Sequence, residues 1–81
     1  MQQHDKLVMM VNQIAKAFEP MGEARAVPLI AQHIKDFWDP RMRRGIFEHL
    51  ELGGAGLHPF ALTALKTLPP VPAPAPPAGA P

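Results

Sequence analysis

Side chains that could do covalent chemistry are scarce in this chain of 81 residues. It contains no cysteine, tyrosine or serine, so its hydroxyl side chains are limited to Thr63 and Thr67. Activated serine and cysteine nucleophiles are therefore excluded. Asp36 and Asp39 lie close in sequence, but a helix end and a helix cap explain this pair better than acid–base catalysis does. We therefore predict that the chain catalyses no reaction of its own.

The four histidines, His4, His33, His49 and His58, match no known metal-binding pattern. No two of them are three or four residues apart, and the His-Glu-x-x-His pattern is missing. His33 and His49 fall on neighbouring predicted helices and could meet, but partly buried or surface positions explain them better than metal ligation. The glycine-rich residues 53–56 lack the Lys-Ser/Thr of a phosphate-binding loop, so we predict a turn. We predict no catalytic, metal-binding or cofactor-binding residue.

One basic segment is unfavourable at the start of a helix that is exposed to water. Arg41, Arg43 and Arg44 crowd the first turn of a predicted helix, where the helix dipole favours acidic side chains. Trp38 precedes them, and tryptophan and arginine are the residue types most enriched in the hot spots of protein interfaces. We therefore predict that this segment contacts a partner protein. Its residues are Trp38, Asp39, Pro40, Arg41, Met42, Arg43 and Arg44.

A purely structural explanation of the same segment is also open. Trp38 would then pack across the joint between two helices while the arginines are solvated, and the two explanations are compatible. Met9 is a second interface candidate, because it lies beside Gln13 and Lys16 on the polar side of the first predicted helix. A single exposed methionine is nevertheless common on protein surfaces and has no need of a functional explanation.

Two helices are predicted in the first half of the chain. Apolar residues recur along one helical face over residues 5–18, and this helix stops before Pro20, because residues that precede proline avoid the α region. A second apolar face, with Phe37 beside it, predicts a helix over residues 23–37. Pro28 interrupts this helix, so we expect an early kink or a start closer to the proline.

Two further helices are predicted in the second half. Asp39 is a suitable N-cap and Pro40 a suitable first residue for a helix that runs to about residue 52 and ends at the glycine-rich turn. Gly45 lies inside this helix, where a glycine often permits the close approach of another backbone. Pro59 is a suitable start for a fourth helix over residues 59–68.

These elements predict an all-α protein, a small bundle of about four short helices with a disordered Pro/Ala-rich C-terminal tail. Nothing alternates with a period of two residues, so no sheet is predicted. Residues 1–68 form the predicted helical domain. Residues 69–81 contain only proline, alanine, valine and glycine, which favour polyproline II and build no core. A flexible tail is the simplest interpretation, and recognition by an aromatic groove on a partner is the alternative.

Size and charge restrict the possible functions. A domain of this length is marginally stable by itself, and without cysteine it has no disulfides, so a partner is the simplest source of added stability. The net charge of +1 provides no strong attraction for nucleic acid or anionic lipid. The sequence shows neither a secretory signal nor the run of about 20 apolar residues that crosses a bilayer. We expect a cytoplasmic protein that binds another protein, and neither nucleic acid nor membrane.

Several segments together resemble a known family. They are residues 5–8 (Asp-Lys-Leu-Val), 12–15 (Asn-Gln-Ile-Ala), 37–43 (Phe-Trp-Asp-Pro-Arg-Met-Arg) and 53–57 (Gly-Gly-Ala-Gly-Leu), with Pro59 soon after. Over residues 5–68 the chain resembles the delta subunit of the cytosolic, NAD-dependent formate dehydrogenases that contain molybdenum or tungsten. It departs from this family at Pro28, where a smoother helix is expected, and at His58, where an aspartate would cap the fourth helix better.

The resemblance implies a role in a larger complex. In that family the alpha subunit carries bis-molybdopterin guanine dinucleotide with molybdenum or tungsten, together with iron–sulfur clusters. The beta and gamma subunits pass electrons to FMN and NAD. The delta subunit binds none of these cofactors and is tied to the assembly or stability of the complex. The resemblance therefore implies a non-catalytic subunit that contacts the alpha subunit directly and shares a complex with beta and gamma.

Two other functions are open at this point. The chain could be a transient maturation chaperone for the same enzyme, present during cofactor insertion and absent from the finished complex. It could also be a small helix-turn-helix protein that binds nucleic acid through Arg41, Arg43 and Arg44, although its near-neutral charge argues against this. Stoichiometry in the purified complex separates a chaperone from a permanent subunit, and strong, salt-dependent DNA binding would favour the third function.

Overall fold

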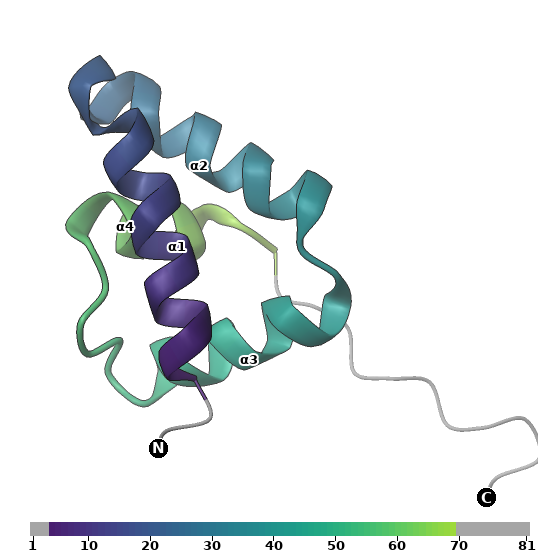
Figure 1. Cartoon of the computed structure of the whole chain (residues 1–81). Helices are drawn as coiled ribbons and strands as arrows, with labels where there is room; N and C mark the ends of the chain where they lie inside the picture. The colour runs from purple at the N-terminus through teal and green to yellow at the C-terminus, as the bar shows by residue number, and fades with distance from the viewer. Residues whose placement is uncertain (1–3, 70–81) are drawn as a thin grey trace, which may run out of the picture.

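The computed structural model of the chain describes residues 4–69. These residues form the helices α1 (Asp5–Phe18), α2 (Glu23–Phe37), α3 (Pro40–Glu51) and α4 (Pro59–Thr67), and a 3-10 turn, η1 (Glu19–Met21), links α1 to α2 (Figure 1). No strand occurs among them. The predicted all-α class with four short helices is therefore confirmed. Residues 70–81, which make up nearly all of the predicted tail, lie outside the described residues.

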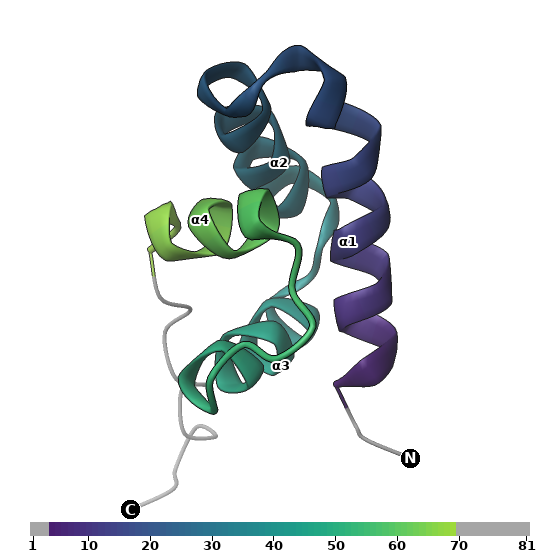
Figure 2. The same cartoon turned by 90° about the vertical axis from the view of Figure 1, so that its left-hand side faces the viewer.

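Helix α1 is the common neighbour of the other three helices. It packs against α2, α3 and α4, while α4 also packs against α2. Figure 2 shows α4 on one side of α1, between α2 above it and α3 below it. Because α1 contacts α2, α3 and α4, its outward face adjoins the exposed surfaces of these three helices.

The core is assembled from the inward faces of all four helices. In α2, Ala26, Ile30 and Ile34 recur once per turn and are fully buried, and Trp38 continues this row just beyond the helix end. Small alanine side chains elsewhere in the core let the helix backbones approach one another closely. The buried residues are Val11, Ala15, Ala26, Ile30, Ile34, Trp38, Ile46, Ala61, Ala64 and Leu65.

Pro28 lies inside α2, which begins at Glu23. The expectation of a helix that starts near Pro28 is therefore wrong. Proline has no N–H, so the carbonyl of Ala24 loses the hydrogen bond that it would accept four residues later. Both Ala24 and Pro28 are exposed, so water can bind this carbonyl instead. The helix tolerates the proline because the unpaired group faces solvent.

The N-termini of α3 and α4 are both capped by side chains. Asp39 Oδ1 accepts a hydrogen bond from the Met42 N–H at 2.8 Å, which confirms the predicted cap of α3. His58 Nδ1 accepts one from the Phe60 N–H at 3.0 Å, and His58 Nε2 donates to Glu19 Oε2 at 2.9 Å. Histidine thus caps α4 in place of the expected aspartate, because an imidazole nitrogen can accept this hydrogen bond.

Candidate partner interface

An apolar groove of about 500 Å³ lies where the C-terminal half of α2 and the start of α3 pack against α1. Its lining contains no aspartate, glutamate, lysine or arginine. We call this feature the Phe37 groove. Its lining residues are Met10, Gln13, Ile14, Ala17, Phe18, His33, Phe37, Trp38 and Met42.

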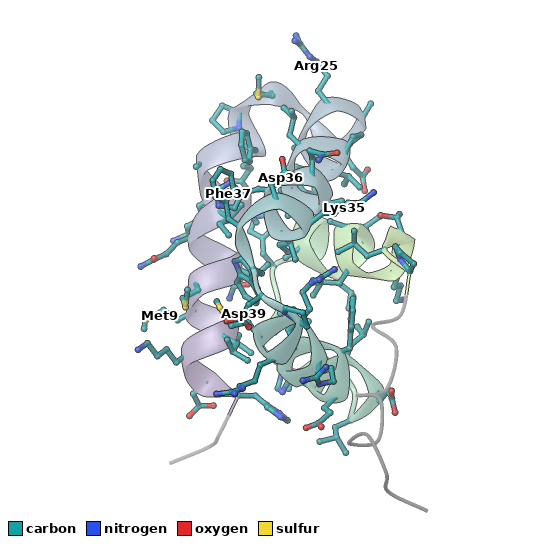
Figure 3. All side chains as sticks on the ribbon, turned by 90° about the vertical axis from the view of Figure 1, so that its right-hand side faces the viewer. Met9, Arg25, Lys35, Asp36, Phe37 and Asp39 are labelled. Carbon is teal, nitrogen blue, oxygen red and sulfur yellow. The ribbon has the colours of Figure 1, made fainter. Side chains whose placement is uncertain are left out.

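Phe37 is the exposed aromatic side chain of this groove. Its side chain lies at the boundary between α2 and α1 (Figure 3), and 72% of the residue surface is exposed. The ring packs on that of His33, one helical turn earlier, with ring centroids 4.8 Å apart. A large aromatic side chain on an apolar surface is characteristic of residues that a partner protein covers.

Trp38, the aromatic residue that the sequence suggested as a contact, is only 5% exposed. It lies four residues after Ile34 and so continues the buried row of α2. Phe37, one residue earlier, is rotated by about 100° from this row and points outward. The sequence-based prediction missed Phe37 as the exposed aromatic residue. Counting in steps of four from Ala26 would have placed Trp38 in the core and Phe37 outside it.

A second hollow, of about 560 Å³, lies beside the Phe37 groove along α1. Met9, the other predicted contact, lines this hollow and is 56% exposed. Figure 3 shows the Met9 side chain projecting from α1. Gln13 lines both hollows, so the two adjoin along the outward face of α1. The full lining is Asp5, Val8, Met9, Asn12, Gln13, Lys16, His49, Ala55 and Gly56.

Asn12 holds the glycine-rich turn that forms the far wall of this second hollow. Its Nδ2 donates a hydrogen bond to the Gly56 carbonyl, and its Oδ1 accepts one from the His58 N–H, each 2.8 Å long. Gly56 has a φ of 80°, in the left-handed region that favours glycine. One amide side chain therefore satisfies two polar groups of the turn and fixes it against α1.

Three of the segments singled out in the sequence converge on this face of α1. Asn12, in the segment 12–15, binds the glycine-rich turn through the hydrogen bonds described above. Gln13, the next residue, lines the Phe37 groove together with Trp38 and Met42 from the segment 37–43. The fold thus brings separate stretches of sequence to one continuous surface.

The basic segment at the start of α3 has no acidic partners in the described part of the chain. Both contacts between a basic and an acidic side chain among residues 4–69 involve a histidine, and neither involves an arginine or a lysine. Arg41 is exposed, whereas Arg43 and Arg44 are half-buried and do not line the groove. The Nε of Arg43 is buried without a hydrogen-bond partner. Asp39 and Pro40 are exposed at the helix start.

Met42 connects this basic segment to the Phe37 groove. It lines the groove and also a smaller hollow of about 260 Å³, to which Lys6 and Arg41 contribute. The structure therefore brings Trp38, Met42 and Arg41 along one edge of the surface, while Met9 lies across α1 in the second hollow. Whether this segment contacts a partner stays a prediction.

Histidines make further polar contacts with neighbouring groups. His4 Nε2 lies 3.2 Å from Glu48 Oε1, and the His4 ring contacts that of His49 with centroids 5.5 Å apart. His49 Nε2 donates to the Ala55 carbonyl at 2.7 Å. Within residues 4–69, no group of three His, Cys, Asp or Glu residues is placed to hold a metal ion. No helix in that range is long and apolar enough to cross a membrane.

Comparison with known protein families identifies one match. The sequence model of the NADH-dependent formate dehydrogenase delta subunit matches residues 6–65. The match runs from the first turn of α1 to Leu65, so it includes every buried core residue. Comparisons with curated proteins and with solved structures give no significant match. Since the family match covers well over half of the 81 residues, the chain belongs to the family of NADH-dependent formate dehydrogenase delta subunits.

Proposed function

We propose that the chain is a non-catalytic small subunit that binds and stabilises the cofactor-bearing alpha subunit of a multisubunit, NAD-dependent formate dehydrogenase in the cytoplasm. The Phe37 groove is the observation that supports this most. Phe37 is 72% exposed beside an apolar hollow, and the free energy falls when a partner removes this apolar surface from water. Membership of a delta-subunit family supplies the kind of partner, because a subunit of this name belongs to a larger enzyme.

The cofactors of the complex are assigned in this proposal to the partner subunits. The alpha subunit would hold bis-molybdopterin guanine dinucleotide with molybdenum or tungsten and the iron–sulfur clusters, and the beta and gamma subunits would serve FMN and NAD. Iron–sulfur clusters are held mainly by cysteine thiolates, and this chain has no cysteine. It also lacks a glycine-rich turn with the spacing that cradles nucleotide phosphates. The residues of this chain therefore do not fit these groups.

Stabilisation of the alpha subunit would follow from preferential binding to its folded state. A ligand that binds only the native state stabilises it by RT ln(1 + [L]/Kd), which is about 2.7 kcal/mol when the free ligand exceeds Kd a hundredfold. The coupling is reciprocal, so the alpha subunit also stabilises this small chain. A protein of this size can thus raise the amount of active enzyme without taking part in the reaction.

Purification of the complex from cells with and without this chain tests the proposal. We expect the chain to co-elute with the alpha subunit in stoichiometric amount, and a transient maturation chaperone would instead be absent from the finished enzyme. Deletion of the chain should lower formate oxidation activity and the molybdenum or tungsten content per alpha subunit. Normal activity and normal metal content in its absence would contradict the proposal.

A further inference from the structure

The surface beside Phe37 changes from apolar to cationic along α1. The Phe37 groove has no charged aspartate, glutamate, lysine or arginine in its lining. The adjoining hollow is lined by Lys6 and Arg41 and contains no aspartate or glutamate. Met42 lines both, so the two parts are continuous. A ligand that covers Phe37 and extends past Met42 therefore meets two cations.

These cations lack acidic partners among the residues that the structure describes. Arg41 lies in the first turn of α3, where the positive end of the helix dipole disfavours it, and this turn contains no acidic residue. One carboxylate oxygen of Asp39, which precedes the turn, accepts a hydrogen bond from the Met42 N–H. Neither Arg41 nor Lys6 forms an ion pair with another residue in the range 4–69. A carboxylate from outside would interact favourably with the guanidinium and with the dipole together.

Phe37 is held in place before any partner binds. Its ring rests against His33, and the next residue, Trp38, is buried and anchors the end of α2. A side chain that is already positioned loses less conformational entropy on binding. Leu52 provides the contrast, because it is 79% exposed but lines neither the Phe37 groove nor the cationic hollow.

We infer that the Phe37 groove and the hollow at Lys6 and Arg41 form one docking surface, occupied by a segment of the alpha subunit that presents apolar side chains followed by carboxylates. This inference rests on the proposed function, since it names the surface and the chemistry of that contact. The apolar side chains fill the groove beside Phe37. The carboxylates bind Arg41, whose planar guanidinium suits bidentate contacts, and Lys6.

Variants of the full chain, co-expressed with the other subunits, test this surface. Phe37→Ala is compared with Leu52→Ala, because both substitutions shorten a highly exposed apolar side chain. Arg41→Glu is compared with Arg25→Glu, because both arginines are exposed and Arg25 lies near the start of α2, away from the groove (Figure 3). Retention of the small chain on the purified complex is measured over a dilution series and a salt series.

We expect Phe37→Ala and Arg41→Glu each to weaken retention by about tenfold or more, with both controls close to wild type. Salt should release the wild-type chain progressively, and Arg41→Glu should flatten this salt dependence. Equal retention of Phe37→Ala and Leu52→Ala, or of Arg41→Glu and Arg25→Glu, overturns the inference. These results would leave the proposed function intact as long as the wild-type chain stays in the complex. Loss of the wild-type chain from the complex contradicts the proposed function itself.

Photo-crosslinking in the assembled complex identifies the occupant. Phe37→p-benzoylphenylalanine should crosslink to an alpha-subunit peptide that contains apolar residues beside aspartate or glutamate, and Leu52→p-benzoylphenylalanine should give no such product. A crosslink from position 37 to the beta or gamma subunit, or to a second copy of this chain, overturns the inference. So does an alpha-subunit peptide without acidic residues.

Discussion

Gly45 provides the space in which α1 and α3 meet. A Cβ atom at position 45 would lie 2.6 Å from Leu7 Cδ1, far inside normal contact distance. The sequence predicted a close approach at this glycine, but the neighbour is a side chain of α1 and not another backbone. Gly45 is not among the glycines with positive φ, so its role is to leave room and not to adopt an unusual backbone conformation.

Gly45→Ala and Leu7→Ala are therefore expected to be coupled in their effects on stability. In the wild-type chain the added methyl group displaces Leu7, which offsets the gain of about 1 kcal/mol that alanine brings over glycine inside a helix. In the Leu7→Ala background the space is free, so Gly45→Ala should stabilise the protein by about that amount. Urea unfolding of the full chain and its three variants measures this coupling. Additive effects of the two substitutions on the free energy of unfolding would contradict a contact between position 45 and Leu7.

Asn12 is the residue at which a change of one atom should matter most. Asn12→Asp removes the N–H that binds the Gly56 carbonyl and places a carboxylate oxygen against it, so we expect a loss of about 1–3 kcal/mol in the free energy of unfolding. Gln13→Glu makes the same chemical change at an exposed neighbour whose side chain forms no hydrogen bond within residues 4–69, and should alter stability by less than about 0.5 kcal/mol. If urea unfolding shows equal losses of stability for the two variants, the added negative charge, and not the lost hydrogen bond, causes the effect.

At the scale of the helix, α4 depends on its N-cap. It has nine residues, and His58 both caps it and binds Glu19 at the end of α1. We expect His58→Ala to lower the free energy of unfolding by about 1 kcal/mol, and His58→Asn to recover most of this loss because asparagine is a good N-cap. Urea unfolding measures both variants. If His58→Asn is as unstable as His58→Ala, the cap contributes little and the contact with Glu19 carries the effect.

The helix boundaries were largely predictable because local signals mark them. The prediction of residues 5–18 for α1 matches Asp5–Phe18, and the Asp39-Pro40 start of α3 is as expected. The expected late start at Pro28 was wrong, since α2 runs through the proline from Glu23, while the expected kink stays a prediction. Ala26 and Ile30, on either side of Pro28, are buried in the core and hold α2 together across it.

The candidate site was less predictable, because it depends on the rotation of α2 about its axis. From the sequence, Val27, Ala31, Ile34 and Trp38 are expected to share the apolar face of α2, with Ile30 and Phe37 beside it. In the structure Ala26 and Ile30 are fully buried in place of Val27 and Ala31, so the buried row continues through Ile34 to Trp38 and Phe37 lies outside it. Contacts with α1 and α4 set the rotation, and such contacts join residues far apart in sequence. Whether the predicted segment contacts a partner stays a prediction, and the exposure of Phe37 beside it was not anticipated.

For the whole molecule, the core of the described residues is small. Four of the ten buried residues in the range 4–69 are alanine, which removes little apolar surface from water. A domain of this length has a stability of only about 0.05–0.15 kcal/mol per residue. Apolar surface buried on docking would therefore add to a small stability. Stability and partner binding are therefore expected to depend on each other in this chain.

The positions of the core and of the proposed docking surface predict that residues 70–81 are dispensable for folding and docking. Within residues 4–69 every buried residue lies between Val11 and Leu65, the family match ends at residue 65, and the proposed docking surface uses no residue beyond α3. A chain that ends at residue 69 should co-purify with the complex and unfold at the same urea concentration as the full chain. A chain that ends at residue 63 is the matched control, because it loses Ala64 and Leu65, which are 0% and 1% exposed, and it should fail both tests. Loss of co-purification on removal of residues 70–81 alone would show instead that the tail takes part in recognition of the partner.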